Sequence, residues 1–233
     1  MFPLKDQNPT SRITWMTWLL LAANVGIFGY EVYLQATAGD LAVASFTQRL
    51  TFDPSALAAS PMSPAVWLTV LTAMFLHAGW VHLGGNMLYL GIFGNNVEDR
   101  IGPWRFLAFY LACGVAASFV QALGTGFPHI RMLGASGAIA GILGAYLLLF
   151  PRARVVTAVF IIFVFELALI PAWIVIGVWF LLQLGAGVAS IGPAAPAAGV
   201  AYLAHVGGFL AGMVLIAPAW IADRRGNRSV TWR

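Results

Sequence analysis

Serine and histidine are the residue types in this sequence best suited to hydrolytic chemistry. Ser136 stands between glycines in the segment GASGAIAG, residues 134–141, and an apolar run follows it. A serine hydroxyl is a weak nucleophile until a neighbouring base takes its proton, and a neutral histidine is a suitable base. His205, near the start of the last apolar block, is the candidate base. The pair predicts acyl transfer by a Ser-His dyad.

The second requirement of such chemistry is a set of donors for the oxyanion that forms when Ser136 attacks a carbonyl. His82 and Asn86 are four residues apart, so they share one face of a helix. We expect their side chains, with the backbone N–H of Ser136 at a helix start, to form the oxyanion hole.

Two stripes of small residues could bring the nucleophile and the base together. Gly137 and Gly141 form one stripe, and Gly208 and Gly212 form the other. Stripes of this kind let helices in a membrane approach closely. We expect these four glycines to pack the helix that carries Ser136 against the helix that carries His205.

No other group completes a triad or a metal site. Glu166 is the only carboxylate embedded in the later apolar blocks, and we expect it near the opposite membrane face. There is no His-Glu-x-x-His motif and no carboxylate beside His77, His82 or His205. No metal and no cofactor are therefore expected, and His77 is interpreted as a structural hydrogen-bond former near the site.

The composition indicates a membrane protein with several spans. Of the 233 residues, 61% are hydrophobic and 9% are charged, whereas a soluble domain carries roughly 25% charged residues. The apolar blocks leave no room for a separate soluble domain, so one membrane domain is expected over residues 1–233, with short cytoplasmic tails at about 1–12 and 223–233. Cys113 has no partner for a disulfide. The net charge of +4 comes from scattered basic residues, so nucleic acid is not an expected partner.

Six apolar blocks could cross a bilayer, and one crossing needs about 20 residues. The blocks are residues 13–34, 65–97, 104–123, 133–150, 155–187 and 197–222. They predict an all-α membrane protein, a bundle of six transmembrane helices with a long first external loop at residues 35–64. The prolines of that loop argue against one regular helix through it. The first block could alternatively be a signal peptide cleaved after Ala36-Thr37-Ala38, but its length favours an uncleaved span.

Basic residues collect on the cytoplasmic side of short loops, and ten of the 12 Lys and Arg residues do so if both termini are cytoplasmic. The ten are Lys5, Arg12, Arg100, Arg105, Arg152, Arg154, Arg224, Arg225, Arg228 and Arg233. The second and fifth blocks then each need an interfacial or re-entrant piece, at residues 65–80 and 155–170, with a break near Pro171. In this topology His82, Ser136 and His205 lie at one depth, just beneath the outer surface.

Three segments together resemble the rhomboid family of intramembrane serine proteases. They are FLHAGWVHLGGNMLYLGIFGNNVEDRIG at residues 75–102, GASGAIAGILGAY at 134–146 and AHVGGFLAG at 204–212. The paired His-x4-His-x3-Asn, the Gly-x-Ser-Gly and the His-x2-Gly-x3-Gly occur in the family's order. Two positions depart from patterns found in the family: Trp67-Leu68 replaces a Trp-Arg pair, and Ala140 stands where some members stack an aromatic ring on the histidine.

The resemblance implies Ser136 as nucleophile, His205 as base, and an oxyanion hole lined by His82 and Asn86. It implies that the substrates are transmembrane helices of other proteins, cut near the outer face of a bacterial inner membrane. It also implies that residues 35–80 lie in the outer leaflet and that residues 172–199 gate entry. The oligomeric state stays open.

Two other functions were weighed against a protease. A catalytically silent member that only binds transmembrane helices would need neither Ser136 nor His205. A transporter or channel would need polar residues along a full path through the bilayer, whereas here they stop at one depth.

Overall fold

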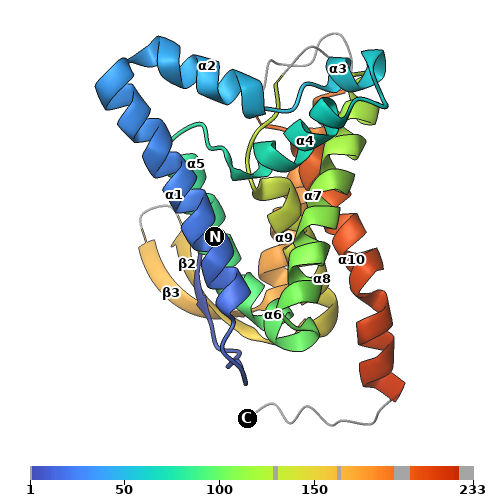
Figure 1. Ribbon diagram of the computed structural model, residues 1–233. Helices are drawn as coiled ribbons and strands as arrows, with labels where there is room; N and C mark the ends of the chain where they lie inside the picture. The colour runs from blue at the N-terminus through green and yellow to red at the C-terminus, as the bar shows by residue number, and fades with distance from the viewer. Residues whose placement is uncertain (1, 128–130, 162–163, 192–199, 226–233) are drawn as a thin grey trace.

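The computed structural model describes residues 2–127, 131–161, 164–191 and 200–225, and most of them are helical (Figure 1). The spanning elements confirm the predicted all-α membrane class, and one small sheet accompanies them. In chain order the elements are β1 (Phe2–Asp6), α1 (Trp15–Ala38), α2 (Asp40–Leu50), α3 (Pro54–Ala59), α4 (Pro64–Thr72), η1 (Ala73–Phe75), α5 (Trp80–Tyr89), η2 (Leu90–Gly94), α6 (Asn95–Ile101), α7 (Pro103–Gly124), α8 (Ser136–Leu149), β2 (Arg154–Ile161), β3 (Val164–Pro171), α9 (Ala172–Ala189) and α10 (Tyr202–Arg225).

The long apolar helices make this a multi-pass integral membrane protein. In the part of the chain that is described, α1, α7, α9 and α10 are each long and apolar enough to cross a bilayer. The helical segments 64–75 and 80–101 form a further pair, bent by 85° at the break between them. Helix α8 has only 14 residues. Length and composition thus support four or five spans, and the six-helix count stays a prediction.

Helix α8 lies at the centre of the bundle, and α7 and α10 pack on it. Every residue from Gly137 to Tyr146 is buried. A Cβ atom at Gly208 of α10 would overlap the backbone carbonyl of Gly137, and one at Gly212 would overlap that of Gly141. On the side of α7, a Cβ at Gly141 would overlap Cys113. The absence of side chains at these glycines therefore allows α8 and α10 to touch backbone to backbone.

The segment between α1 and α5, which includes the predicted external loop, folds into separate short helices. Asp53 caps α3, since its side chain accepts a hydrogen bond of 2.9 Å from the Ser55 backbone N–H, and Pro54 and Pro64 each occupy a first turn. Trp67 anchors α4: its indole N–H donates to the Pro61 carbonyl at 2.8 Å, and its ring lies 5.4 Å from that of Phe119 on α7. Trp67 thus links α4 to Pro61 and to α7 without an arginine at position 68.

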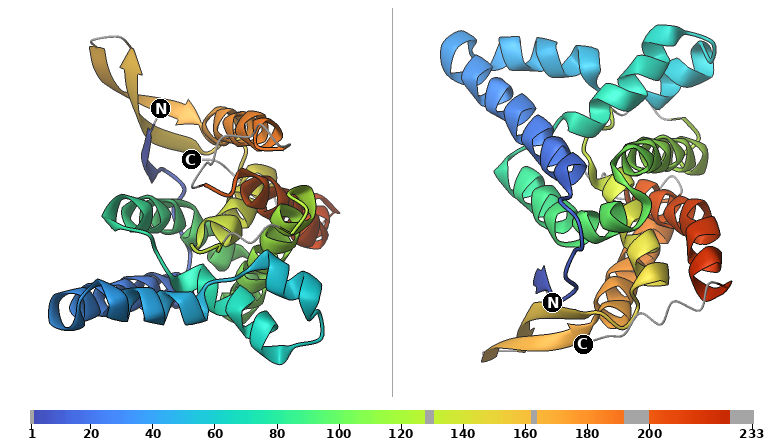
Figure 2. Two further views of the ribbon diagram at one scale, coloured as in Figure 1. Left: turned by 90° about the horizontal axis from the view of Figure 1, so that it is seen from above. Right: turned by 60° about the horizontal axis from the view of Figure 1, so that its bottom comes forward.

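Residues 155–170 were expected as an interfacial or re-entrant piece before the fifth span, but residues 155–161 and 164–170 lie in the two strands of a β-hairpin. Strands β2 and β3 pair antiparallel, and β1 pairs with β2. Residues with branched β-carbons, such as Val155, Val156 and Thr157, favour strands, and the pairing satisfies backbone groups that a loop would expose. Figure 2 shows the hairpin projecting away from the helices. The break expected at Pro171 is correct, because α9 begins at Ala172.

Part of the predicted N-terminal cytoplasmic tail belongs to this sheet. Residues 2–6, expected within a cytoplasmic tail, form β1, and Figure 1 places β2 and β3 at the end opposite α2 and α3. Most of the other predicted tail, residues 226–233, lies outside the described residues.

Candidate active site

Backbone hydrogen bonds join the residues before α8 to the segment between α1 and α5. Phe52 and Met132 exchange two of them, at 3.0 and 2.7 Å, and the Gly134 N–H donates to the Ala73 carbonyl at 2.8 Å. Gly134 has a φ of +119°, a conformation that residues with a Cβ adopt rarely. These bonds determine where α8 begins, and Ser136 is its first residue.

Ser136 and His205 are in direct contact, although 69 positions separate them in the sequence. The Ser136 Oγ lies 2.8 Å from the His205 Nε2. His205 is 9% exposed and belongs to the first turn of α10. The start of that helix is held by α7, because the Ala204 N–H donates to the Gln121 side-chain oxygen at 2.9 Å. The hydroxyl is therefore within reach of a nitrogen that could accept its proton.

His82 lies close to Gly134, two residues before the serine. A Cβ atom at Gly134 would stand 2.8 Å from the His82 Nε2 and 3.9 Å from the Ser136 Oγ. The Ala78 N–H donates to the His82 Nδ1 at 3.3 Å. A neutral imidazole that accepts at Nδ1 carries its proton on Nε2, so His82 presents a donor toward this space.

Asn86 is the second candidate donor, one turn further along α5. Its side chain is 7% exposed. Among the described residues, the Asn86 Nδ2 has no hydrogen-bond partner, which is unusual because buried polar groups are nearly always paired. Asn86 shares a face of α5 with His82, so its unpaired N–H₂ group is a candidate hydrogen-bond donor to a developing negative charge.

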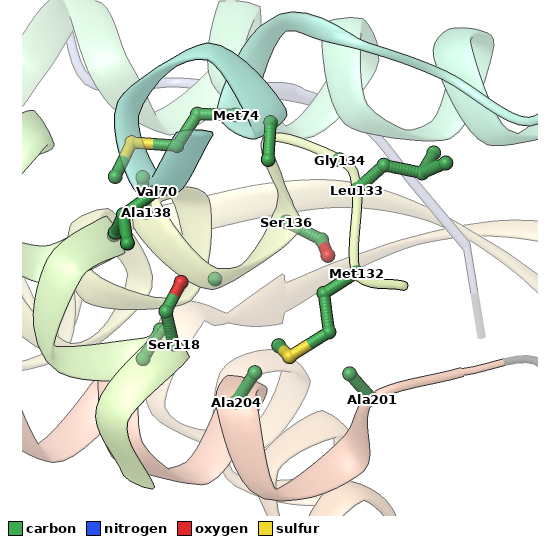
Figure 3. Close-up of a pocket in the computed structure, with 14 residues that line it drawn as sticks. Val70, Met74, Ser118, Met132, Leu133, Gly134, Ser136, Ala138, Ala201 and Ala204 are labelled. Carbon is green, nitrogen blue, oxygen red and sulfur yellow. The ribbon is translucent and has the colours of Figure 1, made fainter. Parts of the chain in front are cut away.

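A cavity of about 40 Å³ opens beside Ser136. Figure 3 shows the Ser136 hydroxyl within it, with Met132, Ala201 and Ala204 on one side and Val70 and Met74 on the other. One water molecule needs roughly 10–15 Å³ measured in this way. The cavity is therefore large enough for the water that a hydrolysis requires.

Helix α9 supplies groups to the site that the sequence reasoning missed. The Gln183 Oε1 lies 2.7 Å from the His205 Nδ1. The Trp179 ring lies 5.9 Å from the His205 ring at an interplanar angle of 37°. A signal was present, since Gln183 is the one carboxamide in the 18 residues of α9.

His77 behaves differently from the expected hydrogen-bond former. Its side chain is 4% exposed, and neither ring nitrogen has a hydrogen-bond partner in the described part of the chain. Its ring stands at 66° to that of His82, with the centroids 5.2 Å apart. His77 thus contacts His82 through its ring.

The remaining sequence expectations concern acids and metals. Glu166 lies on β3, paired with Val159 and exposed, so it belongs to the sheet and not to the site. Within the described ranges, no group of three or more His, Cys, Asp or Glu side chains could hold a metal ion.

A family model and several individual relatives point to the same protein family. A family model described as the rhomboid domain matches residues 64–221. RHOMBOID-like protein 6, mitochondrial, of Arabidopsis thaliana is 31% identical over 168 residues, which are 61% of this chain and 54% of that protein. RHOMBOID-like protein 4 of the same plant is 30% identical over 246 residues, covering 91% of this chain and 57% of its own.

One bacterial relative is named as a protease. The Rhomboid protease GluP of Bacillus subtilis is 43% identical over 81 residues, 35% of this chain and 15% of that protein. The chain spans about half the length of the two plant relatives.

Proposed function

Since this chain belongs to the rhomboid family, we propose that it is an intramembrane serine endopeptidase, which cleaves transmembrane segments of other membrane proteins near the outer face. The observation that carries the proposal is the 2.8 Å distance between the Ser136 Oγ and the His205 Nε2. The family alone would leave open whether this chain is active. The paired hydroxyl and imidazole favour an enzyme over a silent binding protein.

The proposed reaction proceeds through an acyl-enzyme. His205 accepts the proton of Ser136 as the Oγ attacks the scissile carbonyl, and the C–N bond then breaks as His205 gives that proton to the leaving amine. A water molecule next attacks the ester, again with His205 as base, which releases the carboxyl product and restores the serine. Every proton that leaves a nucleophile is thus returned through one imidazole.

Three donors are proposed to stabilise the oxyanion. The candidates are the His82 Nε2–H, the unpaired Asn86 Nδ2 and the backbone N–H of Ser136 at the start of α8. A helix start has unpaired N–H groups and carries a partial positive charge, which favours an anion there. Donors fixed before the reaction need no rearrangement when charge develops.

The short α8 supports cleavage near one face. Its 14 residues rise about 21 Å at 1.5 Å per residue, less than the roughly 30 Å of a hydrocarbon core. If its last turn reaches the inner interface, then Ser136 is recessed below the outer one. We further propose a single domain over residues 1–233 in a bacterial inner membrane, with both termini cytoplasmic, because the basic residues follow that topology.

The test uses the purified full-length protein in detergent. Wild type is expected to be labelled by a fluorophosphonate and to cleave a model single-span substrate. Ser136→Ala and His205→Ala should each lower cleavage by about a thousandfold or more and abolish labelling. A chelator should leave wild-type activity unchanged, because no metal takes part in the proposed steps.

The matched control is Ser11→Ala. The Ser11 hydroxyl binds Asp99 at 3.0 Å, away from the cavity, so this variant should keep wild-type labelling and cleavage. Labelling that persists in Ser136→Ala would show that another residue is the nucleophile.

A further inference from the structure

The His205 ring is held at both of its nitrogens. Nε2 lies 2.8 Å from the Ser136 Oγ, and Nδ1 lies 2.7 Å from the Gln183 Oε1. Within the described ranges, these two are the only hydrogen-bond partners of the ring. The two contacts come from different helices, α8 and α9.

A neutral imidazole carries one N–H, so its tautomer decides whether it can act on the serine. His205 can accept the Ser136 proton only if Nε2 is bare and Nδ1 carries the hydrogen. The Nδ1–H then needs an acceptor, and the Gln183 amide oxygen is at the right distance. In the other tautomer, Nε2–H would point at the hydroxyl and could not take its proton.

The same face of α9 also fixes the plane of the ring. Trp179 lies four residues before Gln183, which places the two side chains on one face of the helix. Its ring is tilted by 37° against the His205 ring at 5.9 Å, while Tyr202 meets that ring edge-on at 6.4 Å. Ala140 of α8 has no aromatic ring that could stack on His205. The orientation of His205 therefore depends on α9.

We propose that Gln183 is a positioning residue that holds His205 in the tautomer with a bare Nε2, while Trp179 holds the plane of the ring. This inference rests on the proposed serine protease function. An amide suits the location, because a carboxylate in the same place would put a charge inside an apolar span at a cost in free energy. Gln183 thus occupies the place that an acid fills in a triad without adding that charge.

The test compares two substitutions at one position in the full-length protein reconstituted in lipid. Gln183→Met has a similar length and no strong acceptor, and it should lower kcat by about 10-fold to 100-fold with KM within about 2-fold of wild type. Gln183→Glu keeps an acceptor and should retain at least about 10-fold more activity than Gln183→Met. Rescue of this kind would not follow if the residue only filled space.

A second measurement observes the proton itself. In protein with ¹⁵N-labelled histidine, wild type should give a protonated Nδ1 signal that is absent in His205→Ala and is shifted or exchange-broadened in Gln183→Met. Val214→Ala is the control, since this side chain on α10, the helix that carries His205, is 72% exposed, and it should keep wild-type kcat.

The possible results separate the inference from the function on which it rests. If wild type cleaves and Gln183→Met matches it, the positioning role is wrong and the proposed function stands. If Gln183→Glu is as inactive as Gln183→Met, the acceptor role is likewise overturned. A wild type that neither cleaves nor takes the fluorophosphonate would overturn the protease proposal itself.

Discussion

The roles proposed for His82 and His205 are opposite: His82 donates a hydrogen bond and His205 accepts a proton. The partner of Nδ1 decides the difference. In His82 that atom accepts a backbone N–H at 3.3 Å, so Nε2 carries the proton and can donate. In the proposed tautomer of His205 the same atom donates to an amide oxygen at 2.7 Å, so Nε2 is left to accept. An oxyanion donor and a general base can therefore share one site without any difference in net charge.

Asn86 provides the residue-scale prediction. If its Nδ2 donates to the oxyanion, Asn86→Ala should lower kcat by roughly 10²-fold to 10³-fold and change KM little, because the interaction forms mainly in the transition state. Steady-state cleavage of the model substrate measures both constants. Thermal unfolding should show a small change, because this N–H₂ group has no partner to lose among the described residues.

The control for Asn86 is another buried asparagine. Asn24 lies in α1, where its Nδ2 donates to the Leu20 carbonyl at 2.7 Å. Asn24→Ala should lower stability and leave kcat near the wild-type value. Equal losses of kcat in both variants would mean that Asn86 only supports the fold.

At the scale of elements, contact between α8 and α10 is what brings the dyad together. The two helices approach so closely that Gly208 and Gly212 face the carbonyls of Gly137 and Gly141. Ser136 immediately precedes one stripe, and His205 shortly precedes the other. In the proposed mechanism the glycines therefore act on catalysis indirectly, by setting the separation of the two helices.

Gly208→Ala tests this separation. The added methyl group would overlap the backbone carbonyl of Gly137, which cannot move away as a flexible side chain could. Overpacking of this kind costs roughly 1–3 kcal/mol, so we expect Tm to fall by several degrees and cleavage to fall with it. Unfolding and activity measured on the same preparation check both effects.

Gly26→Ala is the matched control for the glycine prediction. Gly26 lies in α1, and a Cβ there would meet nothing within 4 Å. Alanine in a helix interior is favoured over glycine by roughly 0.5–1 kcal/mol, so this variant should be as stable as wild type or slightly more so. A Gly208→Ala protein that unfolds at the wild-type temperature would contradict the close packing.

At the scale of the whole molecule, the N-terminal strand ties the sheet to the bundle. Both the Tyr146 hydroxyl of α8 and the Asn96 side chain of α6 donate to the Asp6 Oδ2, at 2.7 and 2.8 Å. Burial raises the pKa of the Asp6 carboxyl above its ordinary value of 3.8, and the hydrogen bonds from Tyr146 and Asn96 oppose that rise. The strand is thus joined to the helix that begins with Ser136.

The raised pKa predicts a pH-dependent stability. The folded protein binds the Asp6 proton more tightly than the unfolded chain does, so the stabilising contribution is fully present below about pH 4 and is lost as the pH rises through the folded pKa. Asp6→Asn removes this titration. Its Tm should therefore fall less than that of wild type between pH 4 and pH 7, as thermal unfolding in detergent would reveal.

The control for the pH prediction is Asp40→Asn, which changes an exposed carboxylate in α2. This variant should follow the wild-type dependence of Tm on pH. If Asp6→Asn has the same pH dependence as wild type, burial of Asp6 does not contribute to it.

Local patterns in the sequence were enough to predict the apolar helices and the candidate residues at their starts. Long apolar runs favour helices in a bilayer, because only internal hydrogen bonds can satisfy the backbone there. Motif spacing also selected Ser136, His205, His82 and Asn86, since four-residue spacing and glycine stripes are properties of a single helix. These features depend on residues close together in the chain.

The tertiary structure decided the features that depend on distant pairing. The strand β1 forms because residues 2–6 pair with residues 155–158. No local sequence pattern predicts that pairing. Gln183 likewise gains a role only where α9 packs beside α10 and its amide oxygen meets the His205 ring. A lone amide in an apolar helix is compatible with many partners, so its partner is decided by packing and not by the sequence around it.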